Sequence, residues 1–232
     1  MRAVAFVLLL LIIVVLLVAL ITLVAQLDVE KSRKRLVERI VEEKIVEVQE
    51  PFVYYTGLEL NEEVIKIAEG GGTQKLFDFF NTFTENPKVT EVIFEESLLI
   101  EVPIVSAFAL AWGESRYKTQ KVNKNVSLKG VVLSRDWGLY QLNDAHRKNW
   151  TKEDFLNIRK NAHEGLSFFK HVLKAFNGEL VLAYGGYNKG INGLRSGDIP
   201  YLTIAHANNI IAYERDMEIK LNYFVNRWKN EQ

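Results

Sequence analysis

The hydrophobic pattern of the chain begins with an unbroken apolar run. Residues 3–25 read AVAFVLLLLIIVVLLVALITLVA and contain no charged residue. About 20 apolar residues suffice to cross a bilayer as a helix, so the pattern predicts a transmembrane anchor over residues 1–27. The alternative, a cleaved signal peptide, requires a shorter apolar core and small residues before the cleavage point, where this chain has Leu23. We therefore expect an uncleaved anchor. The absence of cysteine excludes a lipoprotein anchor.

A charge-dense stretch follows over residues 28–50. Apolar residues recur at helical spacing between its lysines, arginines and glutamates, at Leu36, Val37, Ile40, Val41, Ile45 and Val48. This pattern predicts an amphipathic helical stalk, and residues 28–49 are a candidate surface for self-association. Pro51 ends the predicted stalk, because proline cannot continue a helix interior.

Helical spacing dominates the remaining domain, which we place at residues 51–232. Asn61 precedes an apolar repeat and predicts a helix start, and the three glycines at 70–72 predict its end. Residues 86–87, Asn-Pro, predict a second start, since proline is tolerated in the first helical turn. Pro103 opens a third, apolar segment.

Helical spacing returns from residue 152 to the end, whereas residues 118–135 are polar and rich in turns. Residues 131–133 predict a short strand, and we expect a sheet of two or three strands near 125–142. The domain is therefore predicted to be mainly α-helical, with at most a small β element.

The charge balance and the positions of the histidines bear on two classes of function, nucleic-acid binding and metal binding. The chain carries 29 Lys and Arg against 29 Asp and Glu, a balance that argues against a nucleic-acid partner. Its four histidines, at positions 146, 163, 171 and 206, are scattered. His163 and His171 are spaced to share a helix face, but no acidic partner completes a metal site with them, so no metal site is predicted.

One carboxylate stands in an unusual setting. The segment AFALAWGESRY, residues 107–117, is almost wholly apolar up to Glu114. Apolar walls disfavour the ionised form of a carboxyl group and are expected to raise its pKa. A carboxylic acid that keeps its proton near neutrality can protonate a leaving oxygen, which suits the cleavage of a glycosidic bond.

Several motifs follow Glu114 in a fixed order. They are Glu-Ser at 114–115, SRDWGLYQLN at 134–143, NAHEG at 161–165, LVLAYGGYNKG at 180–190 and IPYLT at 199–203. In this order, over about residues 100–215, they resemble the soluble lytic transglycosylase (SLT) domain of the lysozyme-like superfamily, which cuts peptidoglycan. The resemblance implies a lysozyme-like fold similar to goose-type lysozyme.

The resemblance also implies a mechanism. Glu114 would be the sole acid and base, protonating the oxygen between N-acetylmuramic acid (MurNAc) and N-acetylglucosamine (GlcNAc). It would then take the proton of the sugar's own 6-hydroxyl, so that a 1,6-anhydro ring forms without metal or cofactor. By the same resemblance, Ser115 would position the loop behind the acid, and Gln141 would hydrogen-bond the sugar or the acid. Tyr187 would place its hydroxyl near Glu114, and Asn188 would fix the helix turn. Tyr140 and Trp137 would supply apolar faces for sugar rings.

Asp136 leaves a second mechanism open. Its stretch also resembles animal-type lysozymes, in which this aspartate is a second catalytic carboxylate, and it lies 22 residues after Glu114. A retaining hydrolase needs its two carboxyl groups about 5 Å apart. An Asp136 turned into a cap would leave one acid working alone. LAYGGYNKG matches the transglycosylases and favours the anhydro-forming reaction, and residues 118–133 are expected to shape one rim of the cleft.

The expected substrate determines the expected location. Peptidoglycan lies outside the cytoplasmic membrane, so we expect a single-pass inner-membrane protein whose catalytic domain faces the periplasm or cell wall. The basic residues at 31 and 33–35 favour the opposite orientation, although long domains translocate largely regardless of flanking charge. An inactive glycan-binding scaffold of an envelope complex is the alternative from another class, and the retained Glu114 argues against it.

Overall fold

The computed structural model describes residue 31, residues 52–197 and residues 199–232. The predicted anchor over 1–27 and all but one residue of the predicted stalk over 28–50 lie outside this part of the chain. Within the described residues, no helix combines the length and the apolar composition that crossing a membrane requires. Val53–Gln232 form one compact unit.

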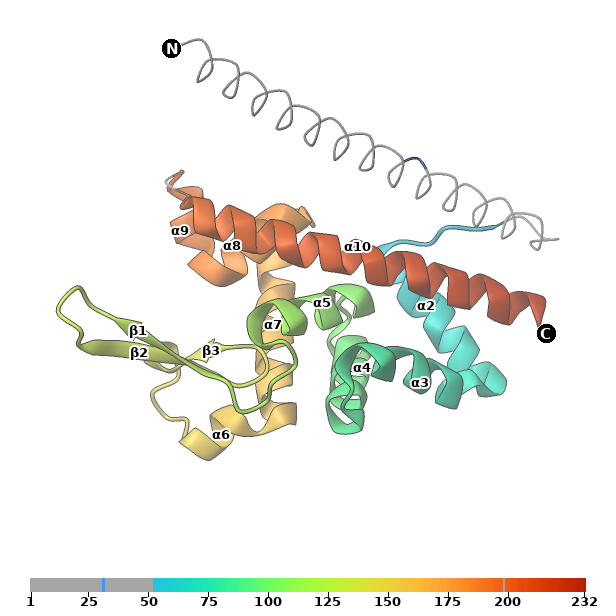
Figure 1. Cartoon of the computed structure of the whole chain (residues 1–232), viewed down its shortest axis with the longest axis horizontal. Helices are drawn as coiled ribbons and strands as arrows, with labels where there is room; N and C mark the ends of the chain where they lie inside the picture. The colour runs from blue at the N-terminus through green and yellow to red at the C-terminus, as the bar shows by residue number, and fades with distance from the viewer. Residues whose placement is uncertain (1–30, 32–51, 198) are drawn as a thin grey trace, which may run out of the picture. The chain divides into compact units, whose positions relative to one another are not determined.

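The compact unit is mainly helical, as predicted, with three short strands at one side, all within residues 122–143 (Figure 1). In chain order the elements are α2 (Gly57–Ile67), the π turn η1 (Ala68–Gly72), α3 (Thr73–Thr84), α4 (Pro87–Ile100), α5 (Ile104–Ser115), β1 (Val122–Val126), β2 (Val132–Trp137), β3 (Leu142–Asn143), η2 (Asp144–His146), α6 (Lys152–Leu156), α7 (Ile158–Ala175), α8 (Leu180–Lys189), α9 (Ile191–Arg195) and α10 (Tyr201–Asn230).

Most predicted helix boundaries are confirmed. Asn86 caps α4 by accepting hydrogen bonds from the amides of Lys88 and Val89, and α5 begins directly after Pro103. The start predicted at Asn61 is wrong, because α2 already begins at Gly57. Asn61 is buried inside α2, where its side chain bonds the main chain of Val102 and Ile104.

Helix α5 lies at the centre of the core. Its residues from Ile104 to Ala111 are all buried, as expected for a helix that is apolar on every side. It packs against α10, α4 and α2, and the ring of Phe108 stacks on Phe80 of α3 at 4.6 Å. The last turn of this immobilised helix carries Glu114.

A buried carboxylate joins three helices. Glu214 of α10 accepts hydrogen bonds from Ser106 of α5 and from the hydroxyl of Tyr184 in α8, the latter at 2.8 Å. Burial raises the pKa of Glu214 above its ordinary value, against the opposing effect of these two donors. The contacts fix α10 against α5 and α8, two of the helices that border the cleft described below.

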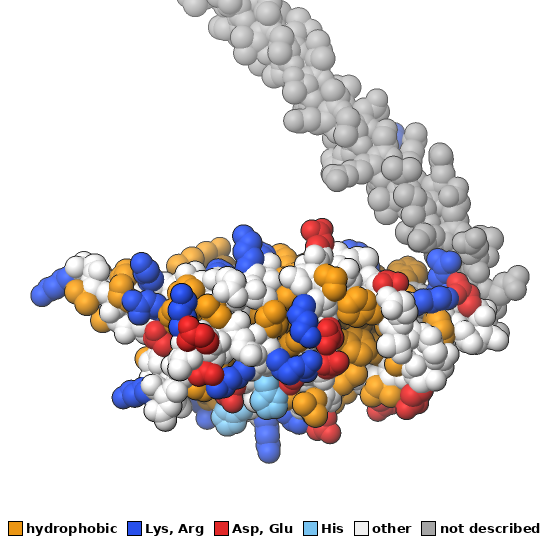
Figure 2. All heavy atoms as spheres, turned by 90° about the horizontal axis from the view of Figure 1, so that it is seen from below, with side chains coloured by type: hydrophobic (Ala, Val, Ile, Leu, Met, Phe, Trp, Pro, Cys, Tyr) orange, Lys and Arg blue, Asp and Glu red, His pale blue; other side chains and the backbone are white. Residues whose placement is uncertain are grey.

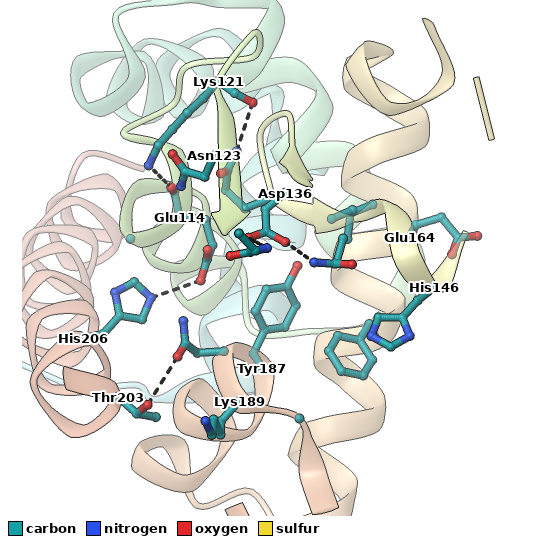
Figure 3. A pocket seen from close by; sticks show the side chains of 18 of the residues that line it. Glu114, Lys121, Asn123, Asp136, His146, Glu164, Tyr187, Lys189, Thr203 and His206 are labelled. Carbon is teal, nitrogen blue, oxygen red and sulfur yellow. Dashed lines mark hydrogen bonds and ion pairs between the residues drawn. The ribbon is translucent and has the colours of Figure 1, made fainter. Parts of the chain in front are cut away.

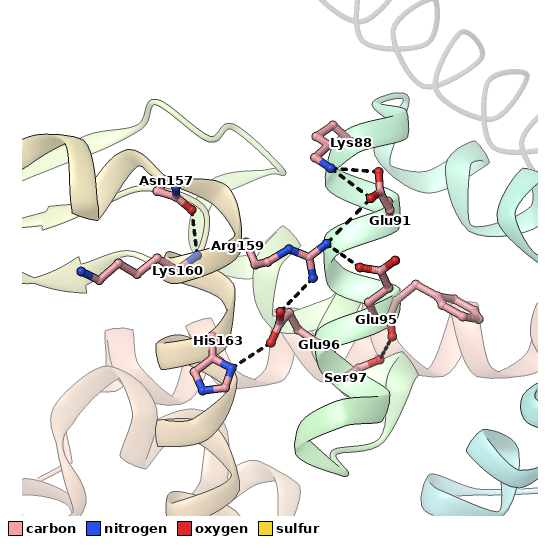
Figure 4. Close-up of polar contacts among 10 residues, drawn as sticks. Lys88, Glu91, Glu95, Glu96, Ser97, Asn157, Arg159, Lys160 and His163 are labelled. Carbon is pink, nitrogen blue, oxygen red and sulfur yellow. Dashed lines mark hydrogen bonds and ion pairs between the residues drawn. The ribbon is translucent and has the colours of Figure 1, made fainter.

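An ion-pair cluster joins α4 to α7 (Figure 4). Arg159 lies 3.0 Å from Glu96 and 3.8 Å from Glu91, and it also contacts Glu95. His163 lies 2.9 Å from the same buried Glu96. The sequence alone did not indicate this contact of His163, because α4 and α7 meet only in the folded chain.

The small sheet is antiparallel in the order β1-β2-β3, as predicted near residues 125–142. Its register places Asp136 of β2 between Asn123 of β1 and Asn143 of β3. The β1-β2 hairpin projects away from the helices, and its tip exposes Leu128 and Leu133. At this end of the molecule hydrophobic and basic side chains lie side by side (Figure 2).

Candidate active site

A cleft of about 920 Å³ lies where the sheet meets the helices. The end of α5, the strands, α7, the end of α8 and the start of α10 all contribute side chains to it. Glu114 lies between His206 and Asp136 in Figure 3, with Tyr187 beside them. Strand β1 supplies Asn123 and Asn125 to the wall, so the segment over 118–133 does shape one side of the cleft, as expected.

Glu114 is held at the C-terminal end of α5. The helix ends at Ser115, and the next residue, Arg116, caps it in the left-handed conformation with φ of 56°. Lys121 donates a hydrogen bond to the main-chain oxygen of Glu114 at 2.5 Å. The carboxyl side chain itself is only 11% exposed, so it faces the cleft with little freedom to turn into solvent.

The contact of Glu114 with His206 was missed by sequence reasoning. Nε2 of His206 on α10 lies 3.1 Å from Oε1 of Glu114. The close approach depends on Gly113, where a Cβ would come within 2.4 Å of the Ile210 side chain on α10. Helical spacing offered one signal: His206 stands one turn before the buried Ile210, so it points toward α5.

Asp136 lines the cleft, and amide groups hold both of its oxygens. Nδ2 of Asn143 donates to Oδ1 at 2.7 Å, and Nδ2 of Asn125 donates to Oδ2 at 2.9 Å. The carboxylate is thus bound by side chains of both neighbouring strands, not turned into the backbone as a turn cap.

Gln141 lines the cleft, but its side-chain NH2 group forms hydrogen bonds to the main chain of the protein. Its Nε2 donates to the main-chain oxygens of Gly138 and Lys121, at 2.7 and 3.1 Å. Its Oε1 is buried and receives no hydrogen bond from the described residues. Gly138 has a φ of 77°, and a Cβ there would lie 2.6 Å from Asn161, so glycine is required at this turn.

Two predicted substrate residues, Ser115 and Tyr140, do not reach the cleft. Ser115 is 1% exposed, and its hydroxyl donates to the main-chain oxygen of Ala111, one turn back in α5. Tyr140 is fully buried, and its hydroxyl donates to the main-chain oxygen of Ala107. Both side chains stabilise the end of α5 and its attachment to the 138–141 turn, and neither is among the described residues that line the cleft.

Trp137 packs against α6. Its ring stacks on Phe155 of α6 with centroids 5.9 Å apart, and its Nε1 donates to Asp144 at 3.2 Å. Trp137 is not among the residues that line the cleft, so the expected face for a sugar ring is absent there. Leu142 and Phe168 supply apolar surface instead.

Tyr187 and Asn188 line the cleft from the end of α8. The hydroxyl of Tyr187 donates to the main-chain oxygen of Tyr140 at 2.8 Å. Burial raises the pKa of Tyr187 well above its ordinary value, and the nearby Glu114 raises it further. Tyr187 therefore stays neutral beside Glu114. Oδ1 of the exposed Asn188 accepts a hydrogen bond from Thr203 of α10 at 3.4 Å, linking the two helices.

The described residues do not form a cluster of side chains that could bind a metal ion. Among residues 31, 52–197 and 199–232, no group of three or more His, Cys, Asp or Glu side chains converges on one point. The titratable groups of the cleft instead alternate in sign, with Lys121, Arg147 and Lys189 set against Glu114, Asp136 and Glu164. Such a mixed lining suits a polar, neutral ligand that offers hydroxyl and amide groups.

A family model and a solved structure each match part of the chain. Residues 91–197 match the family model described as "Transglycosylase SLT domain". Among solved structures, the chain is similar to the 70 kDa soluble lytic transglycosylase from Escherichia coli, at 19% sequence identity and a TM-score of 0.42. That match covers 53% of this chain and 23% of the other. No curated protein matches the chain significantly. The family match includes Glu114, Asp136 and Tyr187 but ends before His206.

Proposed function

We propose that the chain is a lytic transglycosylase of peptidoglycan that cleaves the β-1,4 bond between MurNAc and GlcNAc, because its residues 91–197 match the transglycosylase SLT family model. The predicted family is thereby confirmed, while the activity rests on the site. The observation that carries it is Glu114, a mostly buried carboxyl group that faces a cleft of about 920 Å³ on an immobilised helix end. A cleft of this volume accommodates a short run of sugar rings.

Glu114 is the general acid in the first step. With Oε1 in contact with His206, we assign the transferable proton to Oε2. The proton moves to the glycosidic oxygen as the bond between that oxygen and C1 of MurNAc breaks. The GlcNAc unit leaves with a new 4-hydroxyl, and Glu114 becomes a carboxylate.

Glu114 is the general base in the second step. Its carboxylate takes the proton of the MurNAc 6-hydroxyl while O6 forms a bond to C1. The product is a 1,6-anhydro ring, Glu114 regains its proton, and no water is consumed. His206 stabilises the intermediate carboxylate by donating from Nε2, and Tyr187 stays a neutral dipole beside it.

The surroundings of Asp136 support one acid rather than two. A nucleophilic carboxylate needs an oxygen free to approach the anomeric carbon, whereas each oxygen of Asp136 already accepts a hydrogen bond from an asparagine. Both bonds lower the electron density available for attack. We therefore assign Asp136 to substrate positioning, and a lysozyme-type hydrolase with Glu114 and Asp136 is the second candidate.

Replacement of the acid tests the proposal. Glu114→Gln keeps the shape of the side chain but removes its proton, so release of muropeptides from purified sacculi is expected to fall by about 100-fold or more. The matched control Glu62→Gln changes an exposed glutamate of α2 and should release muropeptides at the wild-type rate. Equal release by Glu114→Gln and wild type would instead indicate the inactive glycan-binding scaffold.

We further propose that residues 3–25 anchor the enzyme in the cytoplasmic membrane, with the catalytic domain on its outer side. The substrate location supports this orientation against the basic residues at 31 and 33–35. Protease added to intact spheroplasts should digest the domain. Protection of the domain until the cells are lysed would contradict the orientation.

A further inference from the structure

The β1-β2 hairpin carries an exposed apolar surface that the proposed reaction does not use. The hairpin projects away from the helices, and we call residues 126–133 the hairpin tip (Figure 1). Leu128 is completely exposed, and Val126, Val131 and Leu133 are each more than half exposed. Burial of apolar side chains is favourable, so several of them together on one projecting tip indicate a docking surface.

The hairpin tip has a fixed shape although it is exposed. The amide of Ser127 donates to the main-chain oxygen of Val131 at 2.8 Å, and the Ser127 hydroxyl accepts from the amide of Val131 at 3.1 Å. Gly130 closes the turn, because its amide donates to the main-chain oxygen of Ser127 at 2.9 Å and its φ of 75° is readily adopted by glycine. The tip therefore needs little further ordering to dock.

The hairpin is basic as well as apolar. Residues 115–135 contain no Asp or Glu, and their six basic residues are Arg116, Lys118, Lys121, Lys124, Lys129 and Arg135. Lys129 follows the exposed Leu128 directly in the tip. A surface that combines basic and apolar side chains suits an anionic bilayer, whose headgroups attract the lysines while its interfacial region receives the apolar groups.

The two faces of the hairpin carry different side chains. Asn123 and Asn125 of β1 line the cleft, whereas Lys124 between them lies on the opposite face, because side chains alternate along a strand. Arg135 pairs in register with Lys124 and lies 3.9 Å from Asp144. We therefore assign contact with the anionic surface to Lys124 and Lys129.

We propose that the hairpin tip inserts into the surface of a bilayer that contains anionic phospholipid, with Leu128 in the interfacial region and Lys124 and Lys129 at the headgroups. A polar glycan would leave the apolar side chains without a partner, and a second copy of the chain would bring two basic hairpins together. Because β1 also supplies the cleft wall, insertion holds the cleft beside the membrane. Lipid binding by the tip does not depend on lytic activity and goes beyond the proposed function.

A fluorescent label on the tip tests the proposal. The chain contains no cysteine, so Leu128→Cys supplies a single labelling site for a fluorophore whose emission shifts to the blue in an apolar environment. The labelled chain, residues 1–232, is reconstituted with vesicles of phosphatidylcholine alone or of phosphatidylcholine with phosphatidylglycerol. With phosphatidylglycerol, the emission should shift to the blue and should be quenched by a nitroxide on the lipid acyl chains. Flotation measures how much of the chain is bound, whichever segment binds it.

Further variants locate the effect. Lys124→Gln and Lys129→Gln, each in the labelled chain, should lower the ratio of inserted to free tip about fivefold, because each lysine near an anionic surface contributes a factor of about this size. The control Lys174→Gln changes an exposed lysine of α7 and should leave insertion unchanged. Leu99→Cys places the label on an exposed leucine of α4, where the emission should not shift. Thermal unfolding checks that each variant keeps its fold.

Three results would overturn the inference. The first is a tip label that keeps its aqueous emission with phosphatidylglycerol vesicles, whether or not the chain floats with them. The second is equal insertion with and without phosphatidylglycerol, and the third is a response of the label to purified sacculi but not to vesicles. Failure of the proposed function is distinguishable from these results, because a labelled chain that also carries Glu114→Gln should insert its tip as the labelled parent does.

Discussion

Nε2 of His206 lies 3.1 Å from Oε1 of Glu114, although 92 residues separate them in the chain. The contact exists because α10 crosses the end of α5 at Gly113, with Ile210 in the space that a side chain would fill. Glu214 holds the same two helices together deeper in the core. The orientation of the proposed acid is thus determined by the packing of two helices, not by its own neighbours in sequence.

The role of His206 predicts different effects for two substitutions. His206→Gln keeps an N–H donor near Glu114 and should lower kcat by less than about tenfold. His206→Leu removes the donor and should lower kcat by about 100-fold, with a smaller change in KM, because the stabilised carboxylate forms during the reaction. Steady-state rates on purified glycan strands check this. Equal kcat for His206→Leu and wild type would show that the contact has no part in the reaction.

Gly113→Ala should reverse the usual effect of this substitution in a helix. Alanine normally stabilises a helix by about 1 kcal/mol relative to glycine. Here the added Cβ would meet Ile210 at 2.4 Å, so we expect a loss of about 1–3 kcal/mol in the free energy of unfolding.

Urea unfolding of single and double variants isolates this clash. Ile210→Ala makes room for the added methyl group, so Gly113→Ala should cost less in the Ile210→Ala background than in the wild type. A stabilised Gly113→Ala would contradict the close packing of α5 on α10.

Asp136→Asn separates the two mechanisms. The substitution turns one acceptor into a donor that faces an asparagine amide, so one of its hydrogen bonds is lost. If Glu114 works alone, kcat should fall by about tenfold while the products keep their anhydro ends. A hydrolase that needs a second carboxylate would lose activity by a factor comparable to that of Glu114→Gln.

Glu214 predicts a pH dependence of stability. Its pKa in the folded state is raised above the ordinary value of 4.5, so the folded state binds this proton more tightly than the unfolded state. The free energy of unfolding should therefore fall as the pH rises from about 4.5 through the raised pKa, and then level off.

Glu214→Gln removes this titration while keeping a side chain of the same shape. The variant should lose less stability than the wild type between pH 4.5 and 7, as measured by chemical unfolding at each pH. Parallel curves for the two proteins would show that burial of Glu214 does not affect folding. The exposed Glu62→Gln serves again as the matched control.

Periodicity and motifs predicted much of the fold and part of the site. Helical spacing and the Asn86-Pro87 pair located elements correctly, because these signals are local. The motif order pointed to Glu114, Asp136, Gln141, Tyr187 and Asn188, which the structure brings to one cleft. Their roles in catalysis remain predictions.

The failures of sequence reasoning share a physical cause. Ser115 and Tyr140 belong to recognisable motifs, but the motif does not say which side chains turn inward, and both bond main-chain oxygens in the core. His206 carries no motif, and its contact arises from the packing of α10 on α5. Helical spacing indicates that His206 shares a face with the buried Ile210, but it does not say which residue of another helix His206 meets.

Mass analysis of the products released from purified sacculi tests the central claim most directly. If Glu114 alone protonates the glycosidic oxygen and activates the 6-hydroxyl, every new MurNAc end should carry the 1,6-anhydro ring and weigh one water less than a reducing sugar. Release of reducing MurNAc ends by the wild-type chain would contradict the account and identify a hydrolase.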